Sequence, residues 1–476
     1  MKAKAFFLVL YLGISLLLFA FFDASIGVWL SFLCSQLLLT TILFIHLFVD
    51  KEYSPFLSAY IVFFFLFFTV APIIQINSLE PNAKFMTNFP YRPDLVIYTN
   101  FMTCLFHGVF IGSYFFFKKI PPLRKVPKIT NRLKGVLPIW ISILFGISLL
   151  VFVVSIGFVL NEISRPSWMA SPYSTALLLI YKKVLFLIPF AGVLLCVQYL
   201  VKGNKKALNL VIVGALMLAF LALLLWFKNP LTEKRNALGP IYISLIFLFL
   251  PKLLNTNFKT LFFLFFTMVI LFPLSAIFTH SDATFEEIYK DPMIFFEQMK
   301  GGGVTSAFNT LNYDAFANFM TTIDYVQQEG LTWGHQLLSG IFFFVPRGVW
   351  ESKPDTTGIF IGDYLISDYR FGYNNLSNPF PSEGYINFGV VGVILMAILL
   401  ALVIVKLLSW LKSNDYIKKI MAFYFAIHLI FLLRGDFANA YSYYIGILAG
   451  VWVIPKLIGK TIEWYSIRSS HGKRSE

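Results

Sequence analysis

The chain has 476 residues, of which 58% are hydrophobic and only 13% are charged, and its formal net charge is +14. Soluble domains contain about 25% charged residues. This chain instead repeats apolar runs of roughly 20 residues, the length that crosses a hydrocarbon core about 30 Å thick. The composition excludes a soluble enzyme and predicts an all-α integral membrane protein.

Other protein classes are excluded by what the sequence lacks. It contains no P-loop and no Rossmann glycine pattern, so it does not encode the nucleotide-binding module of an ATP-driven transporter. The basic residues form scattered clusters beside the apolar runs, which argues against a nucleic-acid partner. The three cysteines, each inside an apolar run, form neither a disulfide framework nor a metal cluster.

The predicted elements are about twelve transmembrane helices. The first run lacks a clear signal-peptide cleavage site, so we expect a retained helix. The eighth and eleventh are short, which leaves ten or eleven full crossings as an alternative. In chain order the predicted helices cover residues 5–22, 26–49, 56–76, 95–117, 135–158, 175–201, 207–227, 237–251, 260–279, 386–408, 420–433 and 438–458.

The Lys and Arg residues predict the orientation, because cytoplasmic loops carry an excess of positive charge. With a cytoplasmic N-terminus, one side carries 24 basic and 5 acidic residues, and the other carries 12 and 19. Lys182 and Lys183, near the outer end of the sixth helix, complete the total. Both termini are therefore predicted to be cytoplasmic.

One outer loop is much longer than the others. It divides the chain into membrane helices 1 to 9 (residues 1–279), the loop (280–385), and helices 10 to 12 with a basic tail (386–476). The loop holds 13 of the 24 acidic residues and five basic ones. Long structured loops are usually functional.

Three short helices are expected within this loop. The spacing of apolar residues predicts an amphipathic helix over residues 306–328, after a flexible triplet of glycines. The apolar stretch at 334–345 is too short to cross and is predicted to lie at the outer interface. A further helix is expected at 358–369.

A cationic pair stands out in the loop. Arg347 and Lys353 lie six residues apart around two prolines that restrict the backbone. A guanidinium fork and an ammonium point charge suit a diphosphate. The alternative is that Arg347 anchors an interfacial helix to lipid headgroups or pairs with Glu351.

Glu383 lies where the chain re-enters the membrane. A partly desolvated carboxylate at this place suits a general base. The alternative is a solvated charge that complements a helix dipole. Arg235 and Arg434 follow other helices on the same predicted side, so both could converge with Arg347 and Lys353 on one lipid-linked phosphate. The alternative is that each of these side chains extends to the lipid headgroups.

These segments resemble the bacterial O-antigen and oligosaccharide repeat-unit polymerases (Wzy-type). The resemblance rests on NYDAF at 312–316, FVPRGVWESKP at 344–354 and SEGYINFG at 382–389, with Arg235 after the long central helices. One departure concerns Asp314, because relatives often read Arg-Phe-Asp where this chain has Asn-Tyr-Asp.

The resemblance implies a metal-independent glycosyltransferase of the GT-C-like membrane class, without a cofactor, in the bacterial cytoplasmic (inner) membrane. It would transfer the growing glycan from undecaprenyl diphosphate to the non-reducing end of a lipid-linked repeat unit on the outer face. Its implied partners are this lipid-linked oligosaccharide and membrane lipid. A chain-length regulator and a flippase are further candidates.

The resemblance also implies roles for individual residues. Arg347 and Lys353 would hold the diphosphate, and Glu383 would take the proton of the attacking hydroxyl. Residues that would support substrate binding are Arg235, Arg434, Asp314, His335, Asn387 and Tyr385.

Two other functions stay open at this point. A lipid-linked oligosaccharide flippase would also have about twelve helices, but its charges would more often lie inside the bundle. An O-antigen ligase would share the fold and the diphosphate site and differ only in its acceptor.

Overall fold

Apolar chain segments in a membrane must satisfy their backbone hydrogen bonds internally, which favours helices. The computed structural model describes residues 2–79, 88–120, 133–164, 172–173, 175–202, 207–230, 233, 235–271, 308–457 and 459–461. Every regular element in these residues is helical. Ten of the described helices are long and apolar enough to cross a membrane, which confirms the predicted class.

Two further apolar helices are shorter within the described residues, Asn236–Phe249 and Asn257–Leu271, and the second ends where the described residues end. The eighth predicted helix is thus short, as expected. The eleventh is not, because it extends over Tyr416–Arg434 and is long enough to cross. The exact number of crossings stays a prediction.

The chain divides into two units. Unit 1 comprises Met1–Pro121, Phe249–Leu407 and Ala426–Ser442. Unit 2 comprises Pro122–Leu248, Leu408–Phe425 and Tyr443–Glu476. The last three long helices contribute to both units: α19 (Phe380–Leu411), α20 (Tyr416–Arg434) and α21 (Phe437–Ile447).

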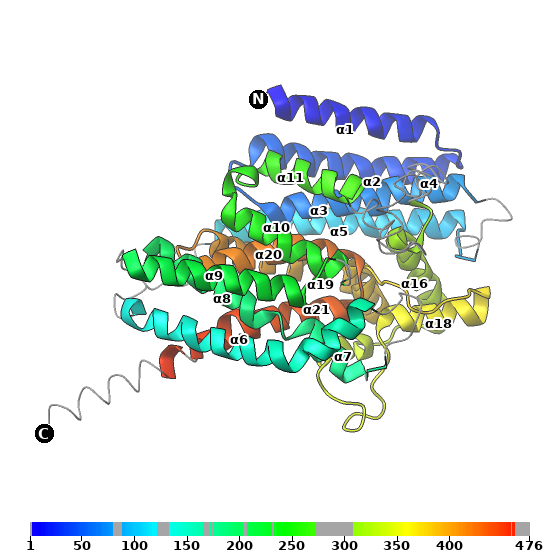
Figure 1. Cartoon of the computed structure of the whole chain (residues 1–476). Coiled ribbons are helices and arrows are strands. Elements are labelled where there is room, and N and C mark those ends of the chain that lie inside the picture. The colour runs from blue at the N-terminus through cyan, green and yellow to red at the C-terminus, as the bar shows by residue number, and fades with distance from the viewer. Residues whose placement is uncertain are drawn as a thin grey trace, which may run out of the picture. The chain divides into compact units, whose positions relative to one another are not determined.

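The other described helices of unit 1 form a bundle with a short-helix region at one end. They are α1 (Lys2–Ala20), α2 (Ile26–Phe44), α3 (Pro55–Phe65), α4 (Ala71–Asn77), α5 (Pro93–Lys119), α11 (Asn257–Phe266), α16 (Ala315–Glu329), α17 (His335–Ile341) and α18 (Thr357–Tyr369). Helices α1, α2, α3, α5 and α11 run side by side (Figure 1). Helix α3 forms the core, because all of its residues are buried.

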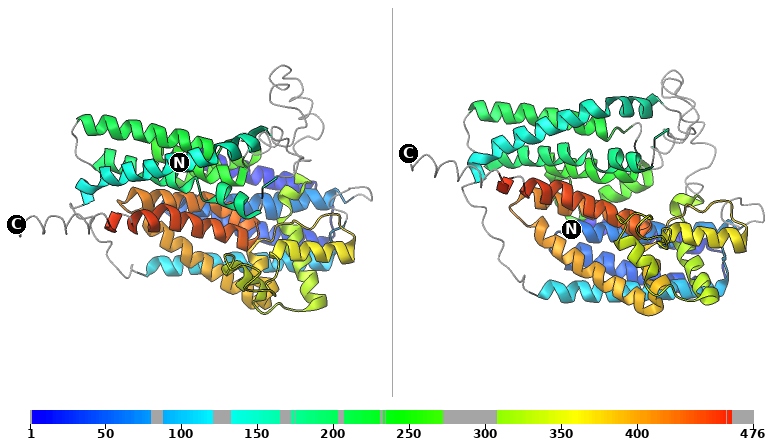
Figure 2. Two further views of the ribbon diagram at one scale, coloured as in Figure 1. Left: turned by 60° about the horizontal axis from the view of Figure 1, so that its bottom comes forward. Right: turned by 90° about the horizontal axis from the view of Figure 1, so that it is seen from below.

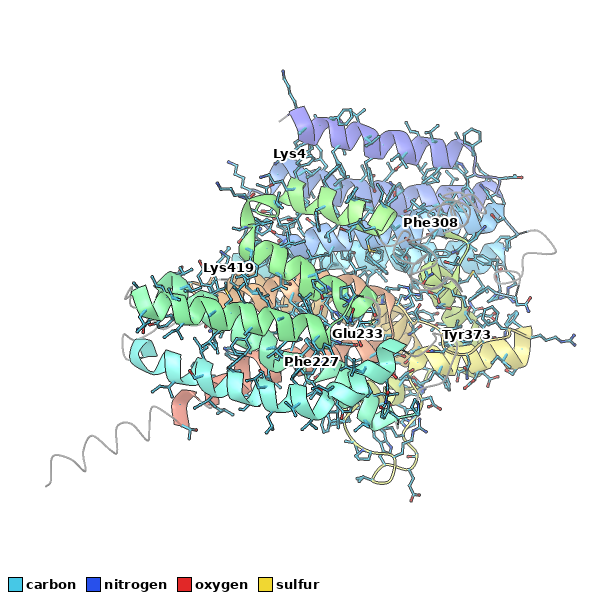
Figure 3. All side chains as sticks on the ribbon, viewed as in Figure 1. Lys4, Phe227, Glu233, Phe308, Tyr373 and Lys419 are labelled. Carbon is cyan, nitrogen blue, oxygen red and sulfur yellow. The ribbon has the colours of Figure 1, made fainter. Side chains whose placement is uncertain are left out.

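Helices α16 and α18 lie together at one end of this bundle (Figure 2), where α16 packs on α5 and α18. Lys4 near the N-terminus and Tyr373 just after α18 mark opposite ends of unit 1 (Figure 3). The orientation of these two ends relative to the membrane stays a prediction.

Unit 2 is a second helical bundle. Its other helices are α6 (Leu133–Ser164), α7 (Thr175–Lys183), α8 (Leu187–Lys202), α9 (Ala207–Phe227) and α10 (Arg235–Phe249). Helix α8 packs against both α6 and α9. Lys419, predicted to be cytoplasmic, and Glu233, predicted to be outside, lie at opposite ends of the unit (Figure 3).

The described part of the long loop begins at residue 308, since residues 272–307 lie outside the described residues. Helix α16 starts at Ala315, later than predicted, because residues 311–313 form a 3-10 turn whose start is capped by Thr310. Helix α17 covers only His335–Ile341 of the predicted apolar stretch. Helix α18 confirms the third short helix. The domain boundaries at 279 and 385 stay a prediction.

Candidate active site

Glu383 lies in the first part of α19 and is 1% exposed. The Thr357 hydroxyl donates to its Oε1 atom at 2.7 Å, and the Asn378 side-chain amide donates to Oε2 at 2.8 Å. Among the described residues, no Lys or Arg forms an ion pair with this carboxyl group. Glu383 is therefore a buried acid that is held by neutral donors only.

A break in α19 separates Glu383 from the rest of the helix. Phe388 and Gly389 have non-helical backbone angles, and Gly389 has a positive φ of 60°, which favours glycine. Across the break, a Cβ atom on Gly392 would overlap the carbonyl oxygen of Gly384. Because Gly384 and Gly392 lack side chains, the short segment with Glu383 can pack closely onto the helix that follows the break.

Asn387 fixes this segment through hydrogen bonds of its side chain. Its Nδ2 atom donates to the carbonyl of Glu383 at 2.8 Å. Its Oδ1 atom accepts from the Thr332 hydroxyl at 3.0 Å and from the Leu337 amide at 3.3 Å. Asn387 is fully buried. Its described contacts therefore fix the backbone around Glu383 and the start of α17.

A second buried carboxylate, Asp436, lies beside Glu383. Its Oδ2 atom accepts from the Gly358 amide, and its Oδ1 atom accepts from the Ala438 amide, both at 2.9 Å. Burial raises the pKa of Asp436, and the amide donors, that of Gly358 first, oppose this shift.

Asp314 is buried at the N-terminal end of α16. Arg434, the last residue of α20, donates from one terminal nitrogen to the Leu311 carbonyl at 2.7 Å and to Asp314 at 3.3 Å. The Ser377 hydroxyl donates to the same Asp314 oxygen at 2.7 Å. The structure thus brings two predicted site residues, Asp314 and Arg434, into one ion pair.

Asn378 connects this ion pair to Glu383. Its Oδ1 atom accepts from Ser382 at 2.7 Å and from Thr322 at 3.2 Å, while its amide holds Glu383. The neighbouring Ser377 contacts Asp314 and Asn318. We call this set the buried polar network; it comprises Asp314, Asn318, Thr322, Thr357, Ser377, Asn378, Ser382, Glu383 and Arg434.

The ammonium group of Lys353 donates hydrogen bonds to backbone carbonyls. Its Nζ atom donates to the carbonyls of Phe342, Phe343 and Val345 at 3.1, 2.9 and 3.0 Å. Three bonds use all three donors of an ammonium group. Burial and the nearby charge of Arg347 lower the pKa of Lys353. In this structure Lys353 closes the turn that follows α17.

Arg347 lies on the same turn and is accessible. Its guanidinium forms an ion pair with Asp355, and the two side chains are 59% and 52% exposed. The partner is therefore Asp355 and not Glu351, which was the alternative expected from the sequence. We call residues 342–355 the exposed turn.

Two other predicted residues have aromatic neighbours. His335 is exposed, and its ring centroid lies 6.1 Å from that of Trp350. Tyr385 is buried, and its ring packs edge-on against those of Tyr98 and Phe319. His335 is thus accessible for a ligand, whereas Tyr385 lies in the core between α19, α5 and α16.

Arg235 begins α10 and belongs to unit 2, and its side chain lies outside the described residues. The three described cations have separate partners: Asp314 for Arg434, Asp355 for Arg347, and backbone carbonyls for Lys353. The convergence of all four into one pocket stays a prediction.

Four further residues belong to the site although no sequence pattern marks them: Thr357, Ser377, Asn378 and Asp436. Asn378 was visible only as a turn residue before proline, and Thr357 only as the residue before a short helix. Their contacts join residues that lie up to 78 positions apart in the chain. No local pattern carries that information.

The described residues contain no group of three or more His, Cys, Asp or Glu side chains that could share a metal ion. The carboxylates of the site are instead satisfied by amides, hydroxyls and one guanidinium. The absence of a metal requirement stays a prediction.

Part of the chain matches a known protein family. Residues 361–461 match the family described as O-antigen polysaccharide polymerase Wzy. The matched segment contains Glu383, Asn387, Arg434 and Asp436, and it begins after Arg347 and Lys353. No curated protein and no solved structure matched the chain.

Proposed function

We infer that this chain is a Wzy-type O-antigen polymerase that elongates glycans on a lipid carrier in a bacterial membrane. The match of residues 361–461 to that family supports the polymerase role, and the ten long apolar helices among the described residues support a multi-pass membrane protein. It would transfer the growing glycan from undecaprenyl diphosphate to the non-reducing end of a lipid-linked repeat unit. The reaction would take place at the outer face of the cytoplasmic membrane and release undecaprenyl diphosphate.

The observation that carries this proposal is the environment of Glu383. The attacking sugar hydroxyl must lose its proton, and a carboxylate without a cationic partner is a suitable acceptor. The Asn378 amide and the Thr357 hydroxyl occupy both oxygens of Glu383. A sugar hydroxyl would replace one neutral donor by another, so the exchange needs no separation of charge.

Access to Glu383 would involve the segment that covers it. Leu376 and Asn374 lie directly on α18, because Cβ atoms on Gly358 and Gly362 would overlap their carbonyl oxygens. Asn378 follows and contacts Glu383. This segment therefore packs against both α18 and Glu383.

Arg347 is the cation that we assign to the diphosphate. An exposed ion pair contributes about 0–1 kcal/mol, so Arg347 can leave Asp355 at little cost. Its guanidinium fork can then bind two phosphate oxygens and stabilise the leaving group. We assign Lys353 to shaping the exposed turn, since its donors hold backbone carbonyls.

The test is to introduce Arg347→Ala and Glu383→Gln separately into a polymer-producing strain. Each change is expected to leave single repeat units on the outside and to abolish long chains at normal protein abundance. Loss of a flippase would leave no repeat units outside. Normal long chains in either variant would contradict the corresponding assignment.

Metal independence is tested in the same system. Membranes from the strain, treated with EDTA and supplied with lipid-linked repeat units, are expected to form polymer at an unchanged rate. A loss of activity that Mg²⁺ or Mn²⁺ restores would show that this part of the proposal is wrong.

A further inference from the structure

Helix α18 begins at Thr357, next to the side chain of Glu383. Thr357, its first residue, donates a hydrogen bond to Glu383, and the next residue, Gly358, donates its backbone amide to Asp436. Two adjacent residues of one helical turn thus contact the two buried carboxylates. The position of the Thr357 hydroxyl therefore depends on the position of the first turn of α18.

Asp436 can fix the position of that turn through its hydrogen bond with Gly358. It is 5% exposed and lies between α20 and α21, where one oxygen caps α21 through Ala438 and the other holds Gly358. Because each oxygen serves a different helix, Asp436 is the link between the start of α21 and the start of α18.

The packing around Gly358 leaves little freedom for this turn. A Cβ atom there would overlap the Leu376 carbonyl oxygen and lie 3.5 Å from Asp436 Oδ2. The rest of α18 has a separate attachment, since Tyr364 in the middle of the helix and Tyr369 at its end both donate to the buried carboxylate of Asp324. Asp324 lies on α16, and its partners on α18 lie farther along that helix than Thr357, so Asp324 offers a matched control.

We propose that Asp436 is a positioning residue for the polymerase reaction: it seats the first turn of α18 so that the Thr357 hydroxyl is aimed at Glu383. The proposal rests on the role of Glu383 as proton acceptor proposed above. Neither Glu383 nor Asp436 has a cationic partner among the described residues.

The chemistry predicts which substitutions separate the roles. Thr357→Val removes the hydroxyl at nearly constant volume, whereas Thr357→Ser keeps it. Asp436→Ser retains an oxygen that can cap α21, because serine is a favoured capping residue. Its side chain is shorter, so it would not reach the Gly358 amide.

The experiment measures the rate of polymer formation in membranes that contain the full-length protein. The probe is the lipid-linked single repeat unit extracted from a strain that lacks the polymerase. We expect Thr357→Val and Asp436→Ser each to lower the rate about ten-fold or more, since small misplacements at a reacting centre cost up to about a hundred-fold. Thr357→Ser is expected to retain a rate near that of the wild type.

A double-mutant cycle tests whether Asp436 acts through Thr357. The Asp436→Ser, Thr357→Val double variant is expected to be no slower than the slower single variant. Asp324→Asn serves as the control, and its effect is expected to multiply with that of Thr357→Val. If Asp436→Ser does not accumulate, Asp436→Asn, which also loses one acceptor, enters the same cycle.

The outcomes separate the two proposals. Multiplicative effects of Asp436→Ser and Thr357→Val, or a wild-type rate for Asp436→Ser, would overturn the positioning role. A wild-type rate for Glu383→Gln would instead overturn the proton-acceptor role on which it rests. Equal rates for Thr357→Val and Thr357→Ser would also contradict the inference.

Discussion

The buried polar network and the exposed turn lie in the same unit and both carry predicted site residues, but their charges are held in opposite ways. In the network, Glu383 and Asp314 are nearly inaccessible, and each has defined hydrogen-bond partners. In the exposed turn, Arg347 and Asp355 are more than half exposed. The buried acids are thus held by several fixed partners, whereas the exposed guanidinium of Arg347 can exchange its partner.

This difference has a physical reason. A buried carboxylate that loses a partner pays the desolvation cost of the unmade bond, about 1–3 kcal/mol. An exposed pair exchanges its partner for water with little change. Substitutions in the two regions should therefore differ in their effect on stability as well as on activity.

The largest expected contrast concerns two glycines. Gly392→Ala would force a Cβ atom onto the Gly384 carbonyl oxygen, so it should prevent accumulation of folded protein or destabilise it by about 3 kcal/mol or more. Gly348→Ala in the exposed turn meets no atom within 4 Å and should leave stability unchanged. Thermal unfolding in detergent compares the two, and equal melting temperatures would contradict the described close approach.

A smaller contrast concerns the two arginines. Arg434→Ala leaves Asp314 buried with Ser377 as its remaining side-chain donor, so we expect a loss of about 1–3 kcal/mol. Asp314→Asn in the Arg434→Ala background should recover part of that loss, because it removes the unpaired charge. Arg347→Ala should leave the melting temperature near that of the wild type. Additive effects at Asp314 and Arg434 would show that the pair does not couple.

Lys353 should behave as a structural residue within the exposed turn. Lys353→Met keeps the length of the side chain but removes three hydrogen bonds to carbonyls, and we expect a loss of about 1 kcal/mol. Arg347→Ala should instead lower kcat/KM for the lipid-linked substrate and leave stability unchanged. If Lys353→Met changes only KM and leaves stability unaltered, the ammonium group contacts the substrate directly.

The smallest expected effect is that of Asp355→Asn. Both members of its ion pair with Arg347 are exposed, so stability should change by less than about 1 kcal/mol. The free guanidinium should bind the diphosphate at least as well as before. A clear loss of stability would show that this pair belongs to the folded core of the site.

The sequence predicted the fold class and most helix positions, because apolar length is a strong local signal. It also identified Glu383, Asp314 and Arg434 as site candidates. It did not predict that Arg434 and Asp314 would pair with each other, since residues 120 positions apart meet only after folding.

The same limit applies to the partners of Glu383. Thr357 and Asn378 have no local feature that marks them as its donors, and Asp436 reads as an ordinary helix-capping residue. The break at Gly389 is equally hidden, because the apolar pattern continues through it and the positive φ follows from close packing onto the next segment.

The central claim is that Glu383 accepts the proton of the attacking sugar hydroxyl, and Glu383→Gln tests it most directly. The glutamine amide can donate to a rotated Thr357 hydroxyl while its oxygen accepts from Asn378, so the fold should persist. With lipid-linked single repeat units as substrate, we predict that polymer formation slows by about a hundred-fold or more at normal protein abundance. A rate equal to that of the wild type would contradict the claim.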